Sequence, residues 1–361
     1  MATVYAVIMA GGVGSRFWPL SRERRPKQLL KIGQAETMIQ NTVSRIADLV
    51  PPERVFVVTN QKQRDAVVEQ LPLVPQSHIL VEPVGRNTAP CIGLAALWIK
   101  KLDPEAMMLV LPADHLIKDV DSFLSIVRSA IDVAGETNGL LTVGIQPTRA
   151  ETGFGYIQID EEQSPAPYRQ KGVFRVKTFA EKPTAETAEQ FLRSGDFLWN
   201  SGMFIWSVKT VLEEIRLHIP DLFEQLRNVE PSIGSLVYKK HLETAYGLIR
   251  GISIDYGLME KARNVYVVRG DFGWSDVGSW DEAAKLLPTD GDGNASTGNV
   301  IALNSTNTFV DTGGKTVALV GVDDLIVINT DDALLVCRKG RSQDVKEVVD
   351  YLRRKQMNDY L

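Results

Sequence analysis

Residues 6–30 read AVIMAGGVGSRFWPLSRERRPKQLL, an unbroken apolar run that meets three glycines, Gly11, Gly12 and Gly14. Glycines after a buried strand let the backbone turn sharply and present its N–H groups to an anion, because no Cβ atom stands in the way. Six cationic side chains follow between positions 16 and 31, and Arg16 and Lys27 lie in the same connection as the glycines. The glycines alone are compatible with a tight turn, but the added cations favour a polyphosphate-binding loop.

Neither of two standard phosphate-binding motifs fits this stretch. A dinucleotide fingerprint counted from Gly12 requires a third glycine where Phe17 stands, which excludes a dehydrogenase of that type. A Walker A loop requires Gly-Lys-Ser/Thr where residues 17–19 read Phe-Trp-Pro. The later GGKT at residues 313–316 also fails, because Phe309 occupies the position of the first glycine.

The composition excludes several classes of protein. A formal net charge of -5 over 361 residues argues against a surface that coats nucleic acid. The two cysteines, Cys91 and Cys337, stand in unrelated contexts, which favours a reducing cytoplasm over a disulfide framework. The apolar start is too short for a signal peptide, and no run approaches the ~20 apolar residues of a membrane span.

The first half of the chain alternates short Val/Ile/Leu runs with helical periods. The predicted strands are 4–9, 55–59, 78–81, 107–111 and 140–144, and the predicted helices are 38–49, 62–71, 89–102 and 122–134. This alternation is typical of βαβ units and predicts an α/β fold with a Rossmann-like, mostly parallel sheet flanked by helices. Ligands of such sheets bind at the carboxyl ends of the strands, so the residues that follow each strand are the functional candidates.

The second half is more mixed and contains a candidate domain boundary. The sequence PTDGDGNASTGN at 288–299 partly resembles a calcium loop, but Ala295 and Ile301 replace the required Gly and Glu. We therefore interpret it as a linker. Short strands between 300 and 336 and a charged helix at 344–355 follow it. The chain is thus predicted to form a larger domain at 1–287 and a small β-rich C-terminal domain at 288–361.

Two aspartates are candidate ligands of a hard metal ion. Asp114 follows the strand 107–111, and Asp276 lies in DFGWSDVGSW at 271–280. Mg²⁺ typically takes one or two carboxylates and completes its coordination with phosphate oxygens of the substrate. Asp114 is also compatible with a helix or turn cap, and 271–280 with an aromatic-stabilised turn. The neighbouring His115 is a candidate base, although a lone histidine beside an apolar strand is more often structural.

Other polar groups follow strands elsewhere. Glu82 precedes a turn, Arg86-Asn87-Thr88, that opens a helix, and helix N-termini bind anions. A carboxylate such as Glu82 accepts hydrogen bonds from the N–H and amino groups of a base. The structural alternative is a helix cap.

Two further dipeptides, Glu181-Lys182 and Asn200-Ser201, complete the list of candidate site residues. Glu181 and Lys182 end a strand before a proline, where a carboxylate can meet sugar hydroxyls and an ammonium can meet a phosphate. Asn200 and Ser201 interrupt an apolar strand, so each needs a partner in the backbone or in a ligand. The sequence lacks a Gly-x-Ser-x-Gly elbow and zinc-ligand spacing among its four histidines, so nothing indicates nucleophilic catalysis or a zinc site.

Taken in order, these motifs resemble the sugar nucleotidyltransferases, and within them the mannose-1-phosphate guanylyltransferases (GDP-mannose pyrophosphorylases). The general signature is GGxGxRxxP from Gly11, followed by Pro26-Lys27. The motifs typical of the guanylyl and mannose branch are FWPLS at 17–21, PKQ at 26–28, GRNTAP at 85–90, WNSGMF at 199–204 and GWSDVGSW at 273–280. The resemblance runs from about residue 4 to residue 280, and Asp255 matches a family motif without a physical role beyond helix capping.

The resemblance implies the nucleotide-diphospho-sugar transferase fold and a reaction of GTP with mannose 1-phosphate, giving GDP-mannose and pyrophosphate with Mg²⁺ as cofactor. It also implies a cytoplasmic homodimer with no nucleic-acid or membrane partner. The long bifunctional relatives add a phosphomannose isomerase domain, for which this chain is too short, so a monofunctional enzyme is expected. The nucleophile is a phosphate oxygen, already mostly ionised because its second pKa is about 6, so no general base is required.

The resemblance also assigns roles to single residues. The expected catalytic residues are Arg16, Lys27, Asp114 and Lys182, with Arg16 and Lys27 on the β- and γ-phosphates and Lys182 on the sugar phosphate. The expected nucleotide-binding residues are Gly11, Gly12, Gly14, Glu82, Arg86, Asn87 and Thr88. The expected sugar-binding residues are Gly155, through its backbone, Glu181 and Asn200. Asp114 and Asp276 are the expected Mg²⁺ ligands.

Two alternatives stay open. The first is a nucleotidyltransferase for other substrates, such as glucose 1-phosphate with UTP or dTTP. Gln28 and the Phe17-Trp18 dipeptide argue against this alternative. The second is a non-catalytic regulatory paralogue that only binds a nucleotide sugar. The presence of the four charged candidates counts against it: Arg16, Lys27, Asp114 and Asp276.

Overall fold

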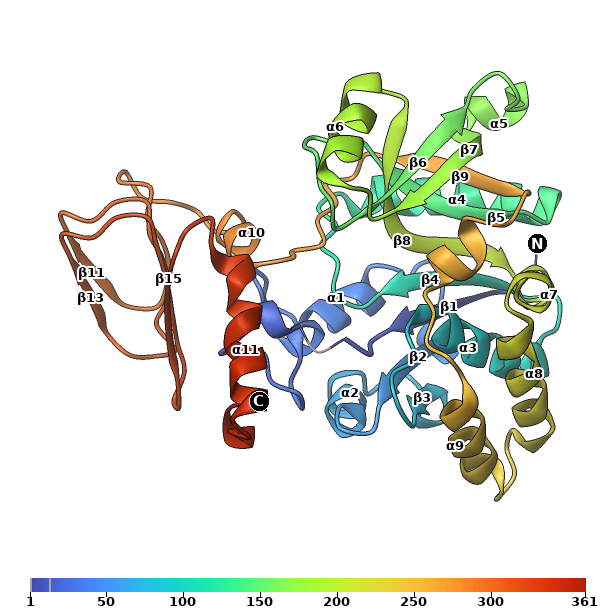
Figure 1. Cartoon of the computed structure of the whole chain (residues 1–361), viewed down its shortest axis with the longest axis horizontal. Coiled ribbons are helices and arrows are strands. Elements are labelled where there is room, and N and C mark those ends of the chain that lie inside the picture. Colours follow the sequence, from blue (N-terminus) through green and yellow to red (C-terminus); the bar gives the residue numbers. More distant parts are fainter. Residues whose placement is uncertain (1, 13) are drawn as a thin grey trace.

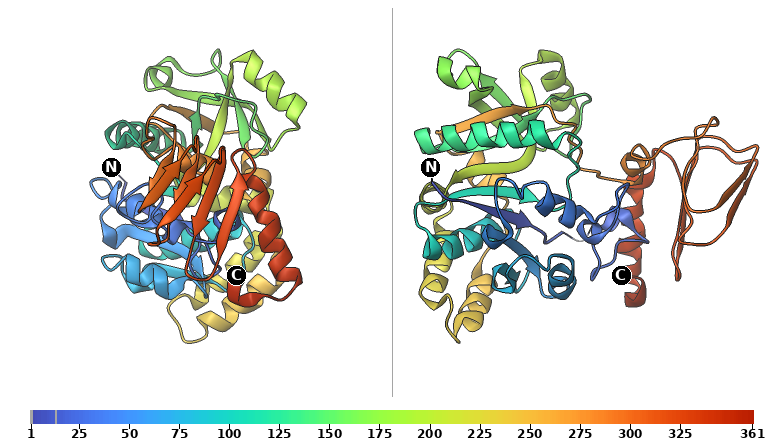
Figure 2. Two further views of the ribbon diagram at one scale, coloured as in Figure 1. Left: turned by 90° about the vertical axis from the view of Figure 1, so that its left-hand side faces the viewer. Right: turned by 180° about the vertical axis from the view of Figure 1, so that it is seen from behind.

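The computed structural model describes residues 2–12 and 14–361. It has a large α/β body and a β-rich C-terminal part that stands to one side, with helix α11 (Val345–Arg354) between them (Figures 1 and 2). Among the described residues, no helix is both long enough and apolar enough to cross a membrane.

The body is built on one twisted sheet. Within the described residues it has nine strands in the order β3-β2-β1-β4-β8-β5-β9-β7-β6. Their bounds are β1 (Val4–Met9), β2 (Val55–Asn60), β3 (Ile79–Glu82), β4 (Met107–Pro112), β5 (Leu140–Ile145), β6 (Gly155–Asp160), β7 (Val173–Glu181), β8 (Phe197–Ser207) and β9 (Val265–Gly270). Strands β1 to β4 form a parallel block, and β5 pairs in parallel with β9. The predicted α/β class is confirmed.

Strand β8 gives the sheet its mixed character. It pairs antiparallel with β4 on one side and with β5 on the other, and β6 and β7 are also antiparallel to their neighbours. Its insertion brings Asn200 and Ser201 from the second half of the chain beside the strands of the first half. The predicted Asn-Ser-Gly interruption is an irregularity in the pairing of β5 with β8, between Thr142 and Gly144.

Helices cover both faces of the sheet. Their bounds are α1 (Met38–Ser44), α2 (Arg64–Gln70), α3 (Thr88–Leu102), α4 (Val120–Thr137), α5 (Ala166–Gln170), α6 (Ala185–Ser194), α7 (Val208–His218), α8 (Pro220–Val229), α9 (Tyr238–Leu248) and α10 (Trp280–Ala284). Strand β1 shows how the two cores form, because successive side chains point to opposite faces. Val7 packs in the core under α3 and α7, whereas Ala6 and Ile8 pack in the core under α1 and α4.

The C-terminal part coils into two small sheets. Strands β10 (Ala295–Thr297), β12 (Phe309–Asp311), β14 (Leu325–Asn329) and β15 (Leu334–Arg338) form one, and β11 (Val300–Leu303) and β13 (Val317–Val320) form the other. Parallel pairing links β10 to β12 to β14, and β11 to β13. The interpretation of 288–299 as a linker is therefore wrong in part, because Ala295–Thr297 is a paired strand and the buried Asn294 side chain bonds to Thr308.

An apolar cluster joins the C-terminal part to the glycine-loop connection. Phe17 and Trp18 pack in one cluster with Trp280 of α10 and with Val345 and Val349 of α11. Trp18 Nε1 donates to the carbonyl of Tyr360 at 2.9 Å, and Trp280 Nε1 donates to the carbonyl of Trp18 at 3.1 Å. Residues next to the glycine loop thus hold the end of the chain.

Candidate active site

Two adjoining cavities lie at the carboxyl ends of β1, β3 and β4. The first, which we call the central cavity, has a volume of about 500 Å³, and the second, which we call the cation cavity, about 370 Å³. His115 and Asp276 line both. The predicted residues that line the central cavity are Gly11, Gly12, Glu82, Asn87, Thr88, Gly155, Glu181 and Asn200. Those that line the cation cavity are Gly14, Arg16, Lys27 and Asp114.

Buried amides brace the glycine loop from behind. Gln28 Nε2 donates to the carbonyls of Ala10 and Gly12, both at 3.0 Å, and Gln63 Nε2 donates to the carbonyl of Gly12 at 3.3 Å. Thr59 Oγ1 adds a bond of 3.0 Å to the carbonyl of Ala10. The carbonyls of the loop are therefore satisfied inside the body, which fixes the loop before any ligand arrives. Gln63 and Thr59 carry no motif that would have revealed this role.

Gly14 allows the loop to approach the Lys27 segment. It has a left-handed backbone, with φ 60° and ψ 37°, and Ser21 Oγ donates to its carbonyl at 2.6 Å. A Cβ atom at this position would lie 2.5 Å from Lys27 Cβ and 2.8 Å from the Lys27 backbone nitrogen. Both the conformation and the contact therefore require glycine.

Lys27 joins the two predicted metal ligands. Its side chain is buried, and Nζ donates to Asp114 Oδ2 at 2.9 Å, to the Asp114 carbonyl at 3.0 Å and to the Asp276 carbonyl. Burial is the largest single influence on Asp114 and opposes its ionisation. The charge of Lys27, the neighbouring His115 and the hydrogen bonds to the carboxylate together outweigh burial and hold the pKa of Asp114 below its usual range. Burial raises the pKa of Asp276, with the Asp114 charge adding to it and Lys27 opposing it. The predicted phosphate ligand Lys27 thus has carboxylate and carbonyl partners that the sequence does not reveal.

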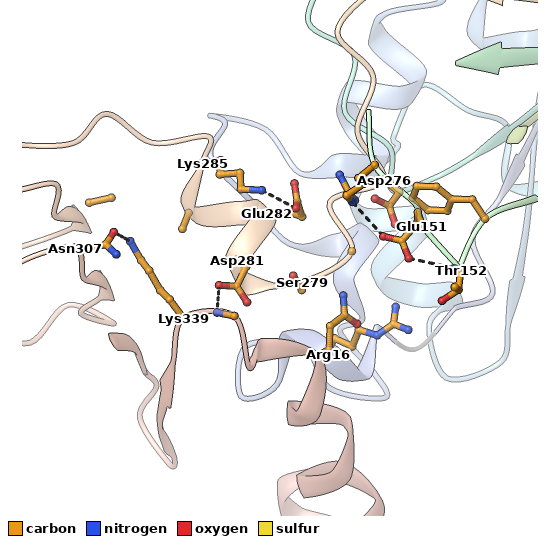
Figure 3. Close-up of a pocket in the computed structure, with 18 of the residues that line it drawn as sticks. Arg16, Glu151, Thr152, Asp276, Ser279, Asp281, Glu282, Lys285, Asn307 and Lys339 are labelled. Atoms are coloured by element: carbon orange, nitrogen blue, oxygen red, sulfur yellow. Dashed lines mark hydrogen bonds and ion pairs between the residues drawn. The ribbon is translucent and has the colours of Figure 1, made fainter. Parts of the chain in front are cut away.

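Arg16 is exposed and lies where the cation cavity opens into a wider cleft. This outer cleft, of about 890 Å³, runs between the body and the C-terminal part. Figure 3 shows Arg16, Glu151 and Asp276 on the side of the body, and Asn307 and Lys339 on the side of the C-terminal strands. The guanidinium is therefore accessible to a ligand in either space.

Asp114 and Asp276 are the candidate metal ligands that line the cation cavity. Within residues 2–12 and 14–361, no three side chains of the His, Cys, Asp or Glu type are grouped as a metal cage. Two carboxylates that line the cation cavity nevertheless suit Mg²⁺, which binds few protein ligands and takes the rest from phosphates and water. Asp114 and Asp276 therefore fit the ion that the sequence predicts.

The far end of the central cavity has a fixed amide and two carboxylates. Asn200 Oδ1 accepts from Thr142 Oγ1 at 3.0 Å, and Asn200 Nδ2 donates to Asp255 Oδ1 at 2.8 Å. Burial raises the pKa of Asp255 to about 7, and the neighbouring charge of Glu181 adds to this effect. A Cβ atom at Gly155 would overlap Glu181 Oε2, so glycine makes room for that carboxylate. Asp255 is a cavity residue whose role the sequence left open.

Lys182 lies outside the central cavity, next to the cavity residue Glu181. Its side chain is 56% exposed, and its Nζ lies 3.1 Å from Glu181 Oε1. It lines neither the central nor the cation cavity as the described residues define them. The backbone at Lys182 has φ 48°, so the chain turns sharply away from β7 at this point.

The opposite end of the central cavity centres on Glu82. Burial raises its pKa to about 7, although Tyr246 Oη donates to Glu82 Oε1 at 3.0 Å and opposes the shift. The other carboxylate oxygen, Oε2, faces the glycine loop, 3.7 Å from where a Cβ atom of Gly11 would stand. A buried carboxyl with one oxygen turned to a cavity is poised to accept hydrogen bonds from a ligand.

In the turn after Glu82, Asn87 and Thr88 line the central cavity, whereas Arg86 holds the turn in place. Asn87 caps α3 by accepting from the Thr88 backbone at 2.9 Å, and Thr88 Oγ1 accepts from the Ile254 backbone at 2.8 Å. Arg86 points elsewhere, because its Nε donates to the carbonyl of Tyr246 at 3.0 Å. Arg86 is not among the described residues that line the central cavity, and it ties the turn to α9 instead.

The aromatic side chains of His115, Phe154 and Trp274 line the central cavity, and His115 also lines the cation cavity. Trp274 Nε1 donates to His115 Nδ1 at 3.1 Å, and the Phe154 ring packs 5.5 Å from Trp274, centroid to centroid. Burial lowers the pKa of His115 to about 4, so the ring is neutral at pH 7. His115 thus accepts a hydrogen bond from Trp274 through one nitrogen and lines both cavities as a neutral ring.

Comparison with known proteins identifies the family. The model of the nucleotidyl transferase family matches residues 5–291, and that of a mannose-phosphate isomerase/GMP-like β-helix domain matches residues 298–352. A mannose-1-phosphate guanylyltransferase of Escherichia coli is 40% identical over 351 residues, which cover 96% of this chain and 75% of the relative. The chain belongs to the mannose-1-phosphate guanylyltransferase branch of the nucleotidyl transferase family.

Other guanylyltransferase relatives and solved structures extend the match. A mannose-1-phosphate guanylyltransferase of Salmonella muenchen is 39% identical over 365 residues, covering 100% of this chain and 76% of the relative. A structure from Thermus thermophilus, described as a mannose-1-phosphate geranyltransferase, is 34% identical with a TM-score of 0.86, covering 97% of this chain and 99% of that one. The match to the latter includes the C-terminal part, so both parts of the fold recur together.

Proposed function

We propose that this nucleotidyl transferase transfers GMP from GTP to mannose 1-phosphate and releases pyrophosphate. The observation that supports this most is the pair of adjoining cavities that share Asp276. One is lined by Arg16 and the Lys27–Asp114 pair, which suit a triphosphate, and the other has buried hydrogen-bond acceptors at both ends. The relatives named mannose-1-phosphate guanylyltransferases support the choice of guanine and mannose.

The reaction is an in-line displacement at the α-phosphorus. A phosphate oxygen of mannose 1-phosphate forms the new bond to that phosphorus, and the bond from the phosphorus to the bridging oxygen of the β-phosphate breaks. The electron pair leaves with pyrophosphate, and no proton needs to be removed because the attacking oxygen is already ionised. The protein therefore contributes positioning and charge neutralisation.

The cation cavity neutralises the leaving group. Arg16 contacts the β- and γ-phosphates, and the backbone of Gly11, Gly12 and Gly14 cradles the nucleotide. Lys27 contributes its charge from the base of the cavity and fixes Asp114 and Asp276. These two carboxylates would hold Mg²⁺, which as a Lewis acid supplies further neutralisation of phosphate charge when bound.

The central cavity orients the guanosine and the sugar. Glu82 accepts from the N–H and amino groups of guanine, with Asn87 and Thr88 toward the ribose and Arg86 positioning their turn. At the other end, Glu181, Asn200 and the Gly155 backbone accept or donate to the mannose hydroxyls. Asp255 orients Asn200, and Lys182 reaches the sugar phosphate from the rim.

The test is a matrix of nucleotides and sugar phosphates. The purified chain is incubated with GTP, UTP, dTTP or ATP and with mannose or glucose 1-phosphate, and pyrophosphate release is measured. We expect the highest kcat/KM for GTP with mannose 1-phosphate. A higher value for another pair would assign the enzyme to that pair, and no release with any pair would favour a nucleotide-sugar-binding protein.

The setting of the enzyme is also part of the proposal. We place the domain division at residue 288, close to the end of the first matched segment, 5–291, and ahead of the second, 298–352. A cytoplasmic location agrees with the free thiols of Cys91 and Cys337. Exposed apolar side chains at Ile301, Leu303 and Val320 would suit a homodimer contact, and light scattering of the purified chain measures its mass directly.

A further inference from the structure

We propose that Lys346, on helix α11, is an additional cationic ligand of the pyrophosphate part of the nucleotide. This inference rests on the proposed function and deepens it. The side chain of Lys346 lines the cation cavity together with Arg16, Lys27 and Asp114. The C-terminal part of the chain therefore supplies a charge to a site otherwise built by the body.

The packing around α11 fixes Lys346 relative to the glycine loop. The adjacent Val345 is buried in the cluster that contains Phe17, the residue after Arg16. On the other side of the cluster, Asp281 of α10 accepts from Ser342 Oγ, and Ser342 Oγ accepts from the Asp281 backbone at 3.1 Å. The start of α11 is thus held at both sides, and the Lys346 ammonium is tethered beside the cavity.

The position of Lys346 within its helix is electrostatically unfavourable. Lys346 is in the first turn, where the helix dipole favours anions, whereas Arg353 and Arg354 are in the last turn, where cations are favoured. A lysine in the first turn would be better placed beside an anion. The polyphosphate that the cavity is suited to bind would supply that anion.

The charged side chains of Asp344, Arg353 and Lys27 pair with residues other than Lys346, so the Lys346 ammonium is available to a ligand. Asp344 pairs with Arg341, and Arg353 pairs with Glu23 and Asp350. Lys27 is occupied by Asp114. Among the residues that the structure describes, Lys346 takes part in no ion pair, and its side chain is exposed. Lys346 and Arg16 are therefore the exposed cations that line the cation cavity.

The ligand that Lys346 contacts follows from the cavity that it lines. The cation cavity is where the β- and γ-phosphates of GTP are expected, and where pyrophosphate would be formed. The sugar-binding carboxylates line the central cavity instead. Loss of the Lys346 charge should therefore weaken the binding of GTP and of pyrophosphate and leave the binding of mannose 1-phosphate unchanged.

The test compares Lys346→Gln with a control just beyond the other end of α11. Lys355→Gln removes an exposed lysine that follows the last turn of α11 and lines neither cavity. Lys346→Arg keeps the charge. KM is measured for GTP and mannose 1-phosphate in the forward reaction, and the dissociation constant of magnesium pyrophosphate is measured by calorimetry with each variant. Thermal unfolding should differ little among the variants, because both lysines are exposed and one charge at a helix end contributes little to stability.

We expect Lys346→Gln to raise KM for GTP and the dissociation constant of pyrophosphate about two- to fivefold, the upper range of one exposed charge contact. KM for mannose 1-phosphate should change less than about twofold, and Lys346→Arg and Lys355→Gln should resemble the wild type. Unchanged pyrophosphate binding in Lys346→Gln, or an equal rise for all three ligands, would overturn the inference. If the wild type binds pyrophosphate but does not turn over GTP with mannose 1-phosphate, the proposed function fails while the calorimetry still tests Lys346.

Discussion

Lys27 Nζ lies 2.9 Å from Asp114 Oδ2, so a buried ammonium from the glycine-loop connection is bonded to a carboxylate at the end of β4. The same ammonium donates to the carbonyls of Asp114 and Asp276. One side chain thereby joins three segments that are far apart in the sequence. Stability and turnover should both depend on it, and they can be separated experimentally.

Lys27→Met removes the ammonium and leaves its three acceptors without this donor. We expect a loss of about 1–3 kcal/mol in the free energy of unfolding, measured in urea, because buried acceptors then go unsatisfied. The double variant with Asp114→Asn should recover part of the stability and none of the activity. Wild-type stability of Lys27→Met would show that the contact is not structural.

Arg16→Ala and Asp114→Ala should each lower kcat at least ~10²-fold, the scale of losing one transition-state charge contact. The control is Arg24→Ala, which removes an exposed arginine from the same connection and should leave kcat unchanged. Circular dichroism confirms that each variant is folded. Near-normal kcat in either Arg16→Ala or Asp114→Ala would remove that residue from the proposed site.

Gly14→Ala should destabilise the protein by about 1–3 kcal/mol, because alanine is strained at φ 60° and its Cβ would meet Lys27. Gly12→Ala is the matched control, since no heavy atom lies within 4 Å of a Cβ atom built there. Unfolding in urea measures both. Equal stabilities of the two variants would contradict the described backbone of Gly14.

Gly155→Ala should raise KM for mannose 1-phosphate at least ~10-fold, because the added methyl group displaces Glu181 and small displacements in a site are costly. KM for GTP should change little. Gly135→Ala in α4, where a Cβ atom meets nothing within 4 Å, is the control for a general effect of alanine. A parallel rise in both KM values would indicate general damage to the fold.

Binding of GDP-mannose should strengthen as the pH rises through about 7, where Glu82 ionises. The carboxylate accepts from guanine, whereas the protonated acid loses one acceptor, so affinity falls below that pH. GDP-mannose suits this measurement because both of its phosphates are diesters, which have no second ionisation near neutral pH. Glu82→Gln should weaken binding and reduce the pH dependence to the part that Asp255 contributes, since the pKa of Asp255 is also about 7. An unchanged pH dependence in Glu82→Gln would assign it to another group.

Much of the site follows from local sequence. The rule that function gathers after strands places Gly11, Glu82, Asn87 and Asp114 at one edge of the sheet, and the structure brings them to two adjoining cavities. The charge pattern around the glycines also identifies the segment that contains Arg16. These residues are predictable because each lies at the end of an element whose periodicity is visible in the sequence.

The remaining features depend on contacts between distant segments. Gln63 and Thr59 brace the glycine loop through buried hydrogen bonds, and neither belongs to a pattern that marks such a role. The side chain of Arg86 is drawn to α9 by a carbonyl 160 positions away. Lys346 reaches the cation cavity only because the apolar cluster around Phe17 and Trp280 holds α11. Tertiary packing, which no local period encodes, decides these positions.

The most direct measurement is pyrophosphate release by the purified wild-type chain with GTP and mannose 1-phosphate, with Mg²⁺ and after its removal by a chelator. We predict release in stoichiometric proportion to GDP-mannose, at least ~10²-fold faster with Mg²⁺ than without it. No release from this pair under either condition, or faster release from UTP or dTTP with glucose 1-phosphate, would contradict the assignment of GTP and mannose 1-phosphate as its substrates.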